Sequence, residues 1–82
     1  MPVAWIPSLM QKLTDGNHNV EVEGETVRQV VDALETRYPG FKGRIVENDR
    51  IKTEIAVAID GEVVTAGLRA KVGPDSEVHF LL

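Results

Sequence analysis

Histidines and carboxylates are the side chains of this chain that could carry chemistry. His18 lies among turn residues, and no second His, Cys or paired carboxylate stands at ligand spacing from it. Glu21, Glu23 and Glu25 alternate along an extended stretch, which is typical of an exposed face and not of an acid–base pair in a pocket. The sequence therefore predicts no metal site and no catalytic residue.

Glycine and cysteine usage excludes further kinds of chemistry. The glycines fall at turns and form neither a phosphate-binding loop nor a dinucleotide fingerprint, so no bound cofactor is expected. The chain has no cysteine, which excludes thiol nucleophiles, disulfides and cysteine metal ligands. Any sulfur chemistry must use a sulfur that the chain does not supply. A free-standing enzyme is the weakest interpretation.

Length and composition indicate one domain over residues 1–82, because 82 residues can bury only one core. Hydrophobic residues make up 43% of the chain and charged residues 27%, the balance of a globular protein. No stretch approaches the roughly 20 apolar residues of a membrane-spanning helix, and the first residues lack the basic start of a signal peptide. We therefore expect a cytoplasmic protein with no membrane partner.

The charge balance indicates which partners to expect. The net charge is −4, and the nine Lys and Arg residues are scattered along the sequence. Nucleic acid binding requires clustered cations, so no nucleic acid partner is expected. An acidic surface suits a basic protein partner.

The clearest predicted element is an amphipathic helix over about residues 26–38. Thr26 and Gln29 have the spacing of a capping box, and Pro39-Gly40 ends the helix. The apolar residues that recur at helical spacing are Val27, Val30, Val31, Leu34 and Tyr38.

Extended segments surround this helix. Alternating apolar and polar residues predict strands, and Asp60-Gly61 is a strong signal for a hairpin turn. Residues 8–13 and 47–49 are predicted as loops, and residues 41–46 as a short helical turn that brings Phe41 and Ile45 to the core. The predicted strands are 2–6, 19–23, 54–59, 62–64 and 77–82.

The order of these elements predicts an α+β fold of the β-grasp (ubiquitin-like) type. Two strands precede the helix and three extended segments follow it, and the apolar face of the helix needs a sheet to cover it. We expect a mixed four- to five-stranded sheet with the one main helix packed on one face.

At this point the chain resembles the sulfur-carrier family of ubiquitin-like proteins, which includes the small subunit of molybdopterin synthase (MoaD), the thiamine sulfur carrier (ThiS) and the cysteine-forming carrier (CysO). The resemblance covers nearly the whole chain and depends on the order of short pieces, none of which is specific alone. The matching pieces are Ile6-Pro7, Leu13-Thr14, Thr26-Val27, Leu34-Glu35, Tyr38-Pro39-Gly40-Phe41, Arg44-Ile45, the strand 55–60 and the turn 73–78.

The resemblance implies two protein partners, an adenylating enzyme and a sulfur-acceptor enzyme. In the family, the last strand continues into a flexible Gly-Gly tail, whose carboxylate is adenylated with ATP and then converted to a thiocarboxylate. This sequence stops at Leu82, and a leucine side chain should not thread a channel that accepts Gly-Gly. We therefore expect this chain, as written, not to be charged with sulfur by the family route.

The predicted partner-binding surface is the open face of the sheet. In the last strand, His79 and Leu81 alternate with core residues, and the small Ala56 and Ala58 leave room for a partner on that face. The partner-binding residues are therefore predicted to be Ala56, Ala58, His79, Leu81 and Leu82. The alternative is a solvated sheet face without a partner. Trp5 is a further candidate anchor, although a lone tryptophan is more often part of a core.

Two functions remain open from the sequence. The first is a sulfur carrier for cofactor or cysteine biosynthesis whose Gly-Gly tail is missing from this chain. The second is a tail-less β-grasp interaction module that docks on a partner without covalent chemistry. The molybdopterin, thiamine and cysteine pathways are not distinguished, because that choice depends on which partner recognises the surface.

Overall fold

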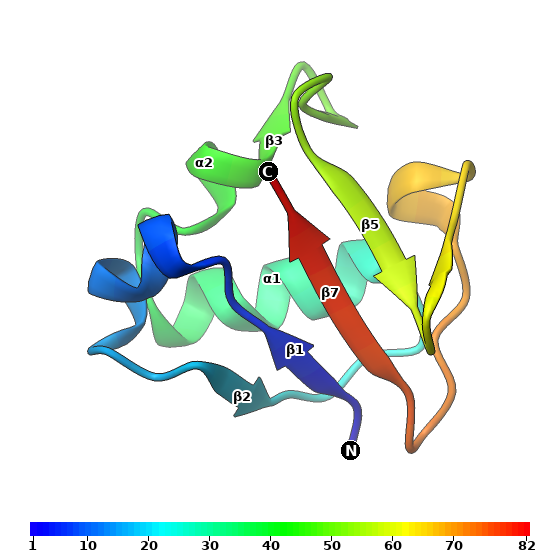
Figure 1. The fold of residues 1–82 in the computed structure, drawn as a ribbon, viewed down its shortest axis with the longest axis horizontal. Coiled ribbons are helices and arrows are strands. Elements are labelled where there is room, and N and C mark those ends of the chain that lie inside the picture. Colours follow the sequence, from blue (N-terminus) through cyan, green and yellow to red (C-terminus); the bar gives the residue numbers. More distant parts are fainter.

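The structure is a computed structural model that describes residues 1–82, and it contains a five-stranded sheet with its main helix on one face. Figure 1 shows α1 (Val27–Arg37) crossing behind the sheet. β1 runs parallel to β7, and the other neighbours are antiparallel. The strands, in spatial order, are β2 (Asn19–Glu21), β1 (Val3–Trp5), β7 (Glu77–Leu81), β5 (Ala56–Ile59) and β6 (Glu62–Val63). The predicted β-grasp fold is confirmed.

The start of α1 has the predicted cap. The Oγ1 atom of Thr26 accepts a hydrogen bond from the backbone N–H of Gln29 at 3.2 Å. The side-chain oxygen of Gln29 accepts in turn from the backbone N–H of Glu25 at 2.7 Å. These bonds satisfy amide groups that the helix itself leaves unpaired. The apolar stripe of α1 is buried against the sheet.

The core lies between α1, the inner face of the sheet and a second short helix, α2 (Lys42–Ile45). Phe41 and Ile45 are fully buried, so the predicted helical turn at 41–46 is confirmed. The ring of Phe41 meets the ring of Phe80 edge-on, with centroids 6.1 Å apart. This contact joins α2 to the central strand β7. None of the helices has both the length and the apolar character needed to cross a membrane.

The loop predicted at residues 8–13 is wrong, because this segment forms the 3-10 helix η1 (Ser8–Thr14). Met10 and Thr14 of this helix are both buried. The Thr14 hydroxyl lies 3.2 Å from the carbonyl oxygen of Gln11 and 3.0 Å from that of Asn17. Asp15 ends the helix in the left-handed region, at φ 54°.

The loop predicted at residues 47–49 is confirmed at Asn48 and Asp49, but the second hairpin, which this turn closes, was not predicted. β3 (Val46–Glu47) pairs with β4 (Arg50–Ile51). The turn residues Asn48 and Asp49 have φ of 52° and 61°, as a two-residue hairpin turn requires. The predicted turn at Asp60-Gly61 is confirmed, since it joins β5 to β6 with positive φ at both residues. A short 3-10 helix, η2 (Gly67–Arg69), follows β6.

Candidate docking face

The outer face of the five-stranded sheet is left uncovered by α1, and we call it the docking face. In β7, Val78 and Phe80 are buried on the helix side, so the alternation of the strand turns His79 and Leu81 to the other side. In β1, the buried Ala4 likewise turns Trp5 outward. The docking face is therefore formed by every second residue of each strand.

The strand register places four of the predicted residues side by side, with Trp5 next to them. His79 lies opposite Ala58 on β5, and Leu81 lies opposite Ala56. On its other side, His79 lies opposite Trp5 of β1. The structure thus brings Ala56, Ala58, His79 and Leu81 together on one face, as the sequence predicted.

The predicted residues contribute unequal areas to this face. Leu81 is 43% exposed and Leu82, which follows the end of β7, is 58% exposed. Ala58 is only 7% exposed, since it lies between His79 and Val63 of the neighbouring strands. Ala58 therefore lines the floor of the face, whereas the leucines offer area. That these residues bind a partner remains a prediction.

Trp5 is the residue whose place sequence reasoning missed. Its ring stacks on the imidazole of His79, with centroids 5.4 Å apart and planes 1° from parallel. The indole N–H donates a hydrogen bond of 2.9 Å to the Oε1 atom of Glu77. A core position, the more common place for a lone tryptophan, is wrong here. The signal was available, because Ala4 and Ile6 on either side of Trp5 are core residues.

Val63 is a second residue that was not predicted. It lies opposite Ala58 on β6 and is 64% exposed. A β-branched residue next to a hairpin turn is common in edge strands, so the sequence held no signal that separates it from an ordinary strand residue. With Val63, the apolar surface extends to the edge of the sheet.

The docking face carries negative charges and no positively charged Lys or Arg on its strands. None of the nine Lys and Arg residues lies on any strand of the five-stranded sheet. Glu21 and Glu77 both lie opposite Val3, so two carboxylates border one end of the face. The docking face is therefore apolar at its centre and acidic at that end.

The other residues considered from the sequence lie outside this face or at its border. His18, Glu21, Glu23 and Glu25 are all exposed. No three His, Cys, Asp or Glu side chains are close enough together to hold a metal ion.

The fold and its open sheet face define a ubiquitin-like β-grasp domain. The model of the ThiS family matches residues 7–82, nearly the whole chain, and the chain therefore belongs to the ThiS family. The resemblance to the MoaD, ThiS and CysO type of sulfur carrier is confirmed by this match and by similar solved structures of CysO.

Three of those structures show how far the similarity reaches. CysO of Amycolatopsis orientalis, in its complex with BexX, is 30% identical, with a TM-score of 0.95 over 99% of this chain and 93% of that chain. CysO of Mycobacterium tuberculosis is 21% identical, with a TM-score of 0.91 over 99% of this chain and 97% of that chain. SAMP1 of Haloferax volcanii is 21% identical, with a TM-score of 0.76 over 98% of this chain and 91% of that chain. A search of curated proteins finds no match.

Proposed function

We propose that this protein is a cytoplasmic sulfur carrier that serves cofactor or cysteine biosynthesis and has no catalytic residue of its own. In this proposal the docking face binds an adenylating enzyme and then a sulfur-acceptor enzyme. The full protein carries a Gly-Gly tail after Leu82, whose carboxylate is adenylated with ATP and converted to a thiocarboxylate. The observation that carries the proposal is the match of the ThiS family to residues 7–82.

The geometry of the docking face supports a protein partner. Trp5 and His79 are stacked and held by Glu77, so the partner meets a rigid aromatic surface and little side-chain freedom is lost on binding. β7 passes through the middle of this surface and leads to Leu82. A tail after Leu82 would therefore leave the domain beside the surface that the partner holds.

The charge of the docking face indicates which kind of partner surface would fit it. Because the strands of the five-stranded sheet carry no Lys or Arg and Glu21 and Glu77 border one end, the complementary surface is apolar with a basic border. That CysO of Amycolatopsis orientalis was crystallised in a complex with BexX supports a function that depends on a second protein.

The first experiment is intact-protein mass spectrometry of the product made by the gene in its own cell, incubated with ATP, a sulfur donor and an adenylating enzyme of that cell. We expect a product that ends in Gly-Gly and gains the mass of one oxygen replaced by sulfur. A product that ends at Leu82 and never changes mass would overturn the carrier proposal.

Two substitutions test the surface in the same assay. His79→Asp and Leu81→Asp each place a carboxylate on the docking face and should slow adenylation at least about tenfold, because an unpaired charge in an apolar interface is costly. The matched control is Thr36→Asp, which adds the same charge on the exposed side of α1. Equal rates in all three variants would mean that the docking face is not used.

The second candidate function is a tail-less interaction module, which the stacked Trp5–His79 pair favours because that surface is formed without any tail. It predicts partner affinity that is lost in His79→Asp or Leu81→Asp while the fold is retained. An unaltered mass together with this loss of affinity would identify the module. Unchanged affinity in both variants would exclude it.

A further inference from the structure

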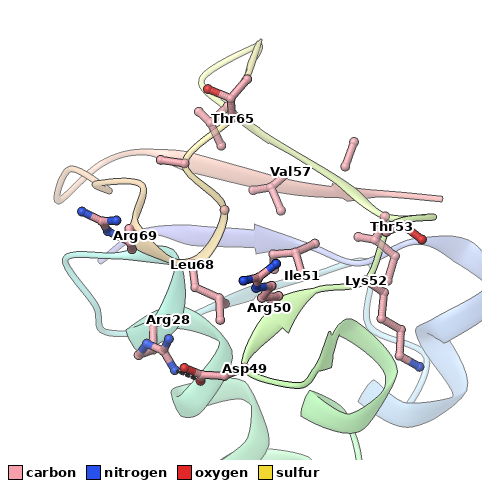
Figure 2. Close-up of a pocket in the computed structure, with 15 residues that line it drawn as sticks. Arg28, Asp49, Arg50, Ile51, Lys52, Thr53, Val57, Thr65, Leu68 and Arg69 are labelled. Atoms are coloured by element: carbon pink, nitrogen blue, oxygen red, sulfur yellow. Dashed lines mark hydrogen bonds and ion pairs between the residues drawn. The ribbon is translucent and has the colours of Figure 1, made fainter.

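A groove on the helix side of the sheet lies next to the docking face and shares Ala56 with it. It has a volume of about 540 Å³ and lies between β4, the beginning of β5 and η2, with the first turn of α1 along one border. Figure 2 shows Arg50 beside the apolar Ile51 and Leu68 in the middle of the groove, and Arg28 and Arg69 to one side. We call it the cationic groove, and the residues that the argument uses are Arg28, Arg50, Ile51, Val57, Leu68 and Arg69.

Cations are concentrated at this groove. Four of the chain's nine Lys and Arg residues line it, namely Arg28, Arg50, Lys52 and Arg69, against the single carboxylate of Asp49. The two ion pairs of the protein are Arg28–Asp49 and Lys42–Asp32, so Arg50, Lys52 and Arg69 have no acidic partner. A chain with a net charge of −4 thus presents a locally positive surface.

The border of the groove already binds one carboxylate. The guanidinium of Arg28 donates a hydrogen bond of 2.6 Å to the Oδ1 atom of Asp49. This bond lowers the pKa of the Asp49 carboxyl below its usual value. Asp49 reaches Arg28 from the tight turn between β3 and β4, where its φ is 61°. Asp49 therefore occupies the place that a carboxylate of a ligand would take.

The floor of the groove is apolar. Val57 is 3% and Leu68 is 6% exposed, and Ile51 beside them is half-buried. An inorganic anion would leave this floor without a contact. Binding sites of roughly 300–1,000 Å³ hold a small molecule or a few side chains, and arginines favour carboxylates, which they bind through two parallel hydrogen bonds.

We propose that the cationic groove binds an acidic peptide segment of a partner protein, in which an apolar side chain contacts Leu68 and carboxylates on either side of it contact Arg50 and Arg69. Arg28 joins the contact when the peptide displaces Asp49. The chemistry of recognition is therefore the reverse of that on the docking face, where the protein supplies the carboxylates.

The two surfaces can be occupied at the same time. Val57, at the groove, and Ala58, on the docking face, are neighbours on β5 and point to opposite sides of the sheet. The two surfaces meet at Ala56, which lines the groove and also lies opposite Leu81, so a partner on one surface meets the other only there. The proposal does not depend on sulfur transfer, and its test does not use a tail.

The test is fluorescence anisotropy of a fluorescein-labelled peptide, Glu-Asp-Leu-Glu-Leu-Asp-Glu, titrated with the whole chain. The variant Arg50→Glu/Arg69→Glu should bind at least about tenfold more weakly, since two attractive contacts become repulsive. The matched control is Lys12→Glu/Arg44→Glu, which changes the net charge equally at exposed residues away from the groove. Circular dichroism checks that each variant is folded.

A third variant is expected to bind the peptide more tightly instead of more weakly. Asp49→Asn removes the competing carboxylate, and asparagine tolerates the left-handed backbone at that position. The peptide should therefore bind several-fold more tightly, which a merely structural role of the turn would not produce.

Four results would overturn the proposal. One is no binding by the unsubstituted chain, and another is equal weakening in the groove variant and its control, which indicates non-specific attraction. A third is displacement of the peptide by an equal concentration of inorganic phosphate, which indicates a small-anion site. The fourth is sedimentation as a dimer that Arg50→Glu/Arg69→Glu dissociates, which indicates that a second copy of the chain occupies the groove.

Discussion

The docking face and the cationic groove share the strand β5 but are built in different ways. The docking face consists of side chains fixed by the hydrogen-bonded register of neighbouring strands, such as Trp5 opposite His79. The groove is assembled from β4, η2 and the first turn of α1, and it depends on turn residues with left-handed backbone such as Asp49. Substitutions should therefore separate the two surfaces, unless they act on the core that both share.

That shared core is the place of the largest expected effect. Phe41 is fully buried and its ring contacts that of Phe80 on β7. In the sequence, Phe41 comes directly before α2, which is followed by β3. Phe41→Ala should lower the free energy of unfolding by about 3–5 kcal/mol, because it removes apolar contacts and leaves a cavity. Urea denaturation measures the change.

The control for Phe41→Ala is Leu9→Ala, at a side chain that is 78% exposed. It should change the stability by less than about 0.5 kcal/mol. Amide hydrogen exchange in the Phe41 variant should accelerate on both β7 and β4. Faster exchange on β4 alone would show that the two surfaces do not share one core.

A smaller effect, confined to the sheet, is expected at Asp60. Its Oδ1 atom accepts a hydrogen bond from the backbone N–H of Glu77, and its Oδ2 atom accepts one from the hydroxyl of Ser76, both at 2.9 Å. Its φ is 52°. Asp60→Ala should cost about 2–3 kcal/mol, because it removes both bonds and places alanine in the left-handed region.

Asp75→Ala is the control for Asp60→Ala, since Asp75 is exposed two residues before Glu77. The loss at Asp60 should loosen the start of β7, which also positions the carboxylate that holds Trp5. The fluorescence of Trp5, the single tryptophan, should therefore change in Asp60→Ala and not in Asp75→Ala. Peptide binding to the groove should be retained in both, and its loss in Asp60→Ala would contradict the separation of the two surfaces.

Sequence patterns predicted the surface built by strands and missed much of the surface built by turns. Alternation in 54–59 and 77–82 was enough to bring Ala56, Ala58, His79 and Leu81 to one face, because the strand period fixes the side on which each residue lies. Trp5 obeyed the same rule, and the prediction failed there because a general preference for core tryptophan was set above the local alternation.

The hairpin of β3 and β4 could not be predicted from the alternation of apolar and polar residues. β3 and β4 have two residues each, too few for an alternating pattern to be recognised. Asn48-Asp49 lacks the glycine that marks Asp60-Gly61 as a hairpin turn. The cations of the groove come from three separate parts of the sequence, at Arg28, at Arg50 and Lys52, and at Arg69. They are scattered along the chain, and only the fold brings them together.

The next prediction concerns the turn of the second hairpin, where a substitution should lower the free energy of unfolding by about 1 kcal/mol. Asn48 has φ 52°, a conformation that asparagine tolerates better than alanine does. Asn48→Ala should destabilise the protein by about this amount, whereas Asn48→Gly should change it less, since glycine adopts positive φ readily. Thermal denaturation compares the two.

The loosening caused by Asn48→Ala should be local to the groove. The backbone N–H of Lys52, which donates to the carbonyl of Ile45 at 2.9 Å, should exchange faster with solvent. The N–H of His79 on β7 should keep its exchange rate. Equal acceleration at both amides would mean that the second hairpin and the sheet open together.

The smallest expected effect is on the stability of the fold at low pH. It also distinguishes the helix side of the protein from the sheet. The Glu35 carboxylate accepts hydrogen bonds from the backbone N–H of Gly40, at 3.0 Å to Oε2, and of Lys42, at 2.8 Å to Oε1. These bonds, with that of Gly40 the larger cause, lower the pKa of Glu35 below its usual 4.5. A lowered pKa in the folded state stabilises the fold above the pKa of the unfolded chain. The contribution is lost as the pH falls through the lower, folded pKa.

Glu35→Gln should therefore flatten the dependence of stability on pH below about 4.5, whereas Glu47→Gln, at an exposed carboxylate, should change it less. The two carboxylates with lowered pKa are Glu35, at the junction of α1 and α2, and Asp49, at the border of the groove. Neither lies on the five-stranded sheet. As the pH falls, amide exchange should thus rise first at Lys42 and Lys52 and only later at His79, and the reverse order would show that the sheet, and not the helix side, is the acid-sensitive part.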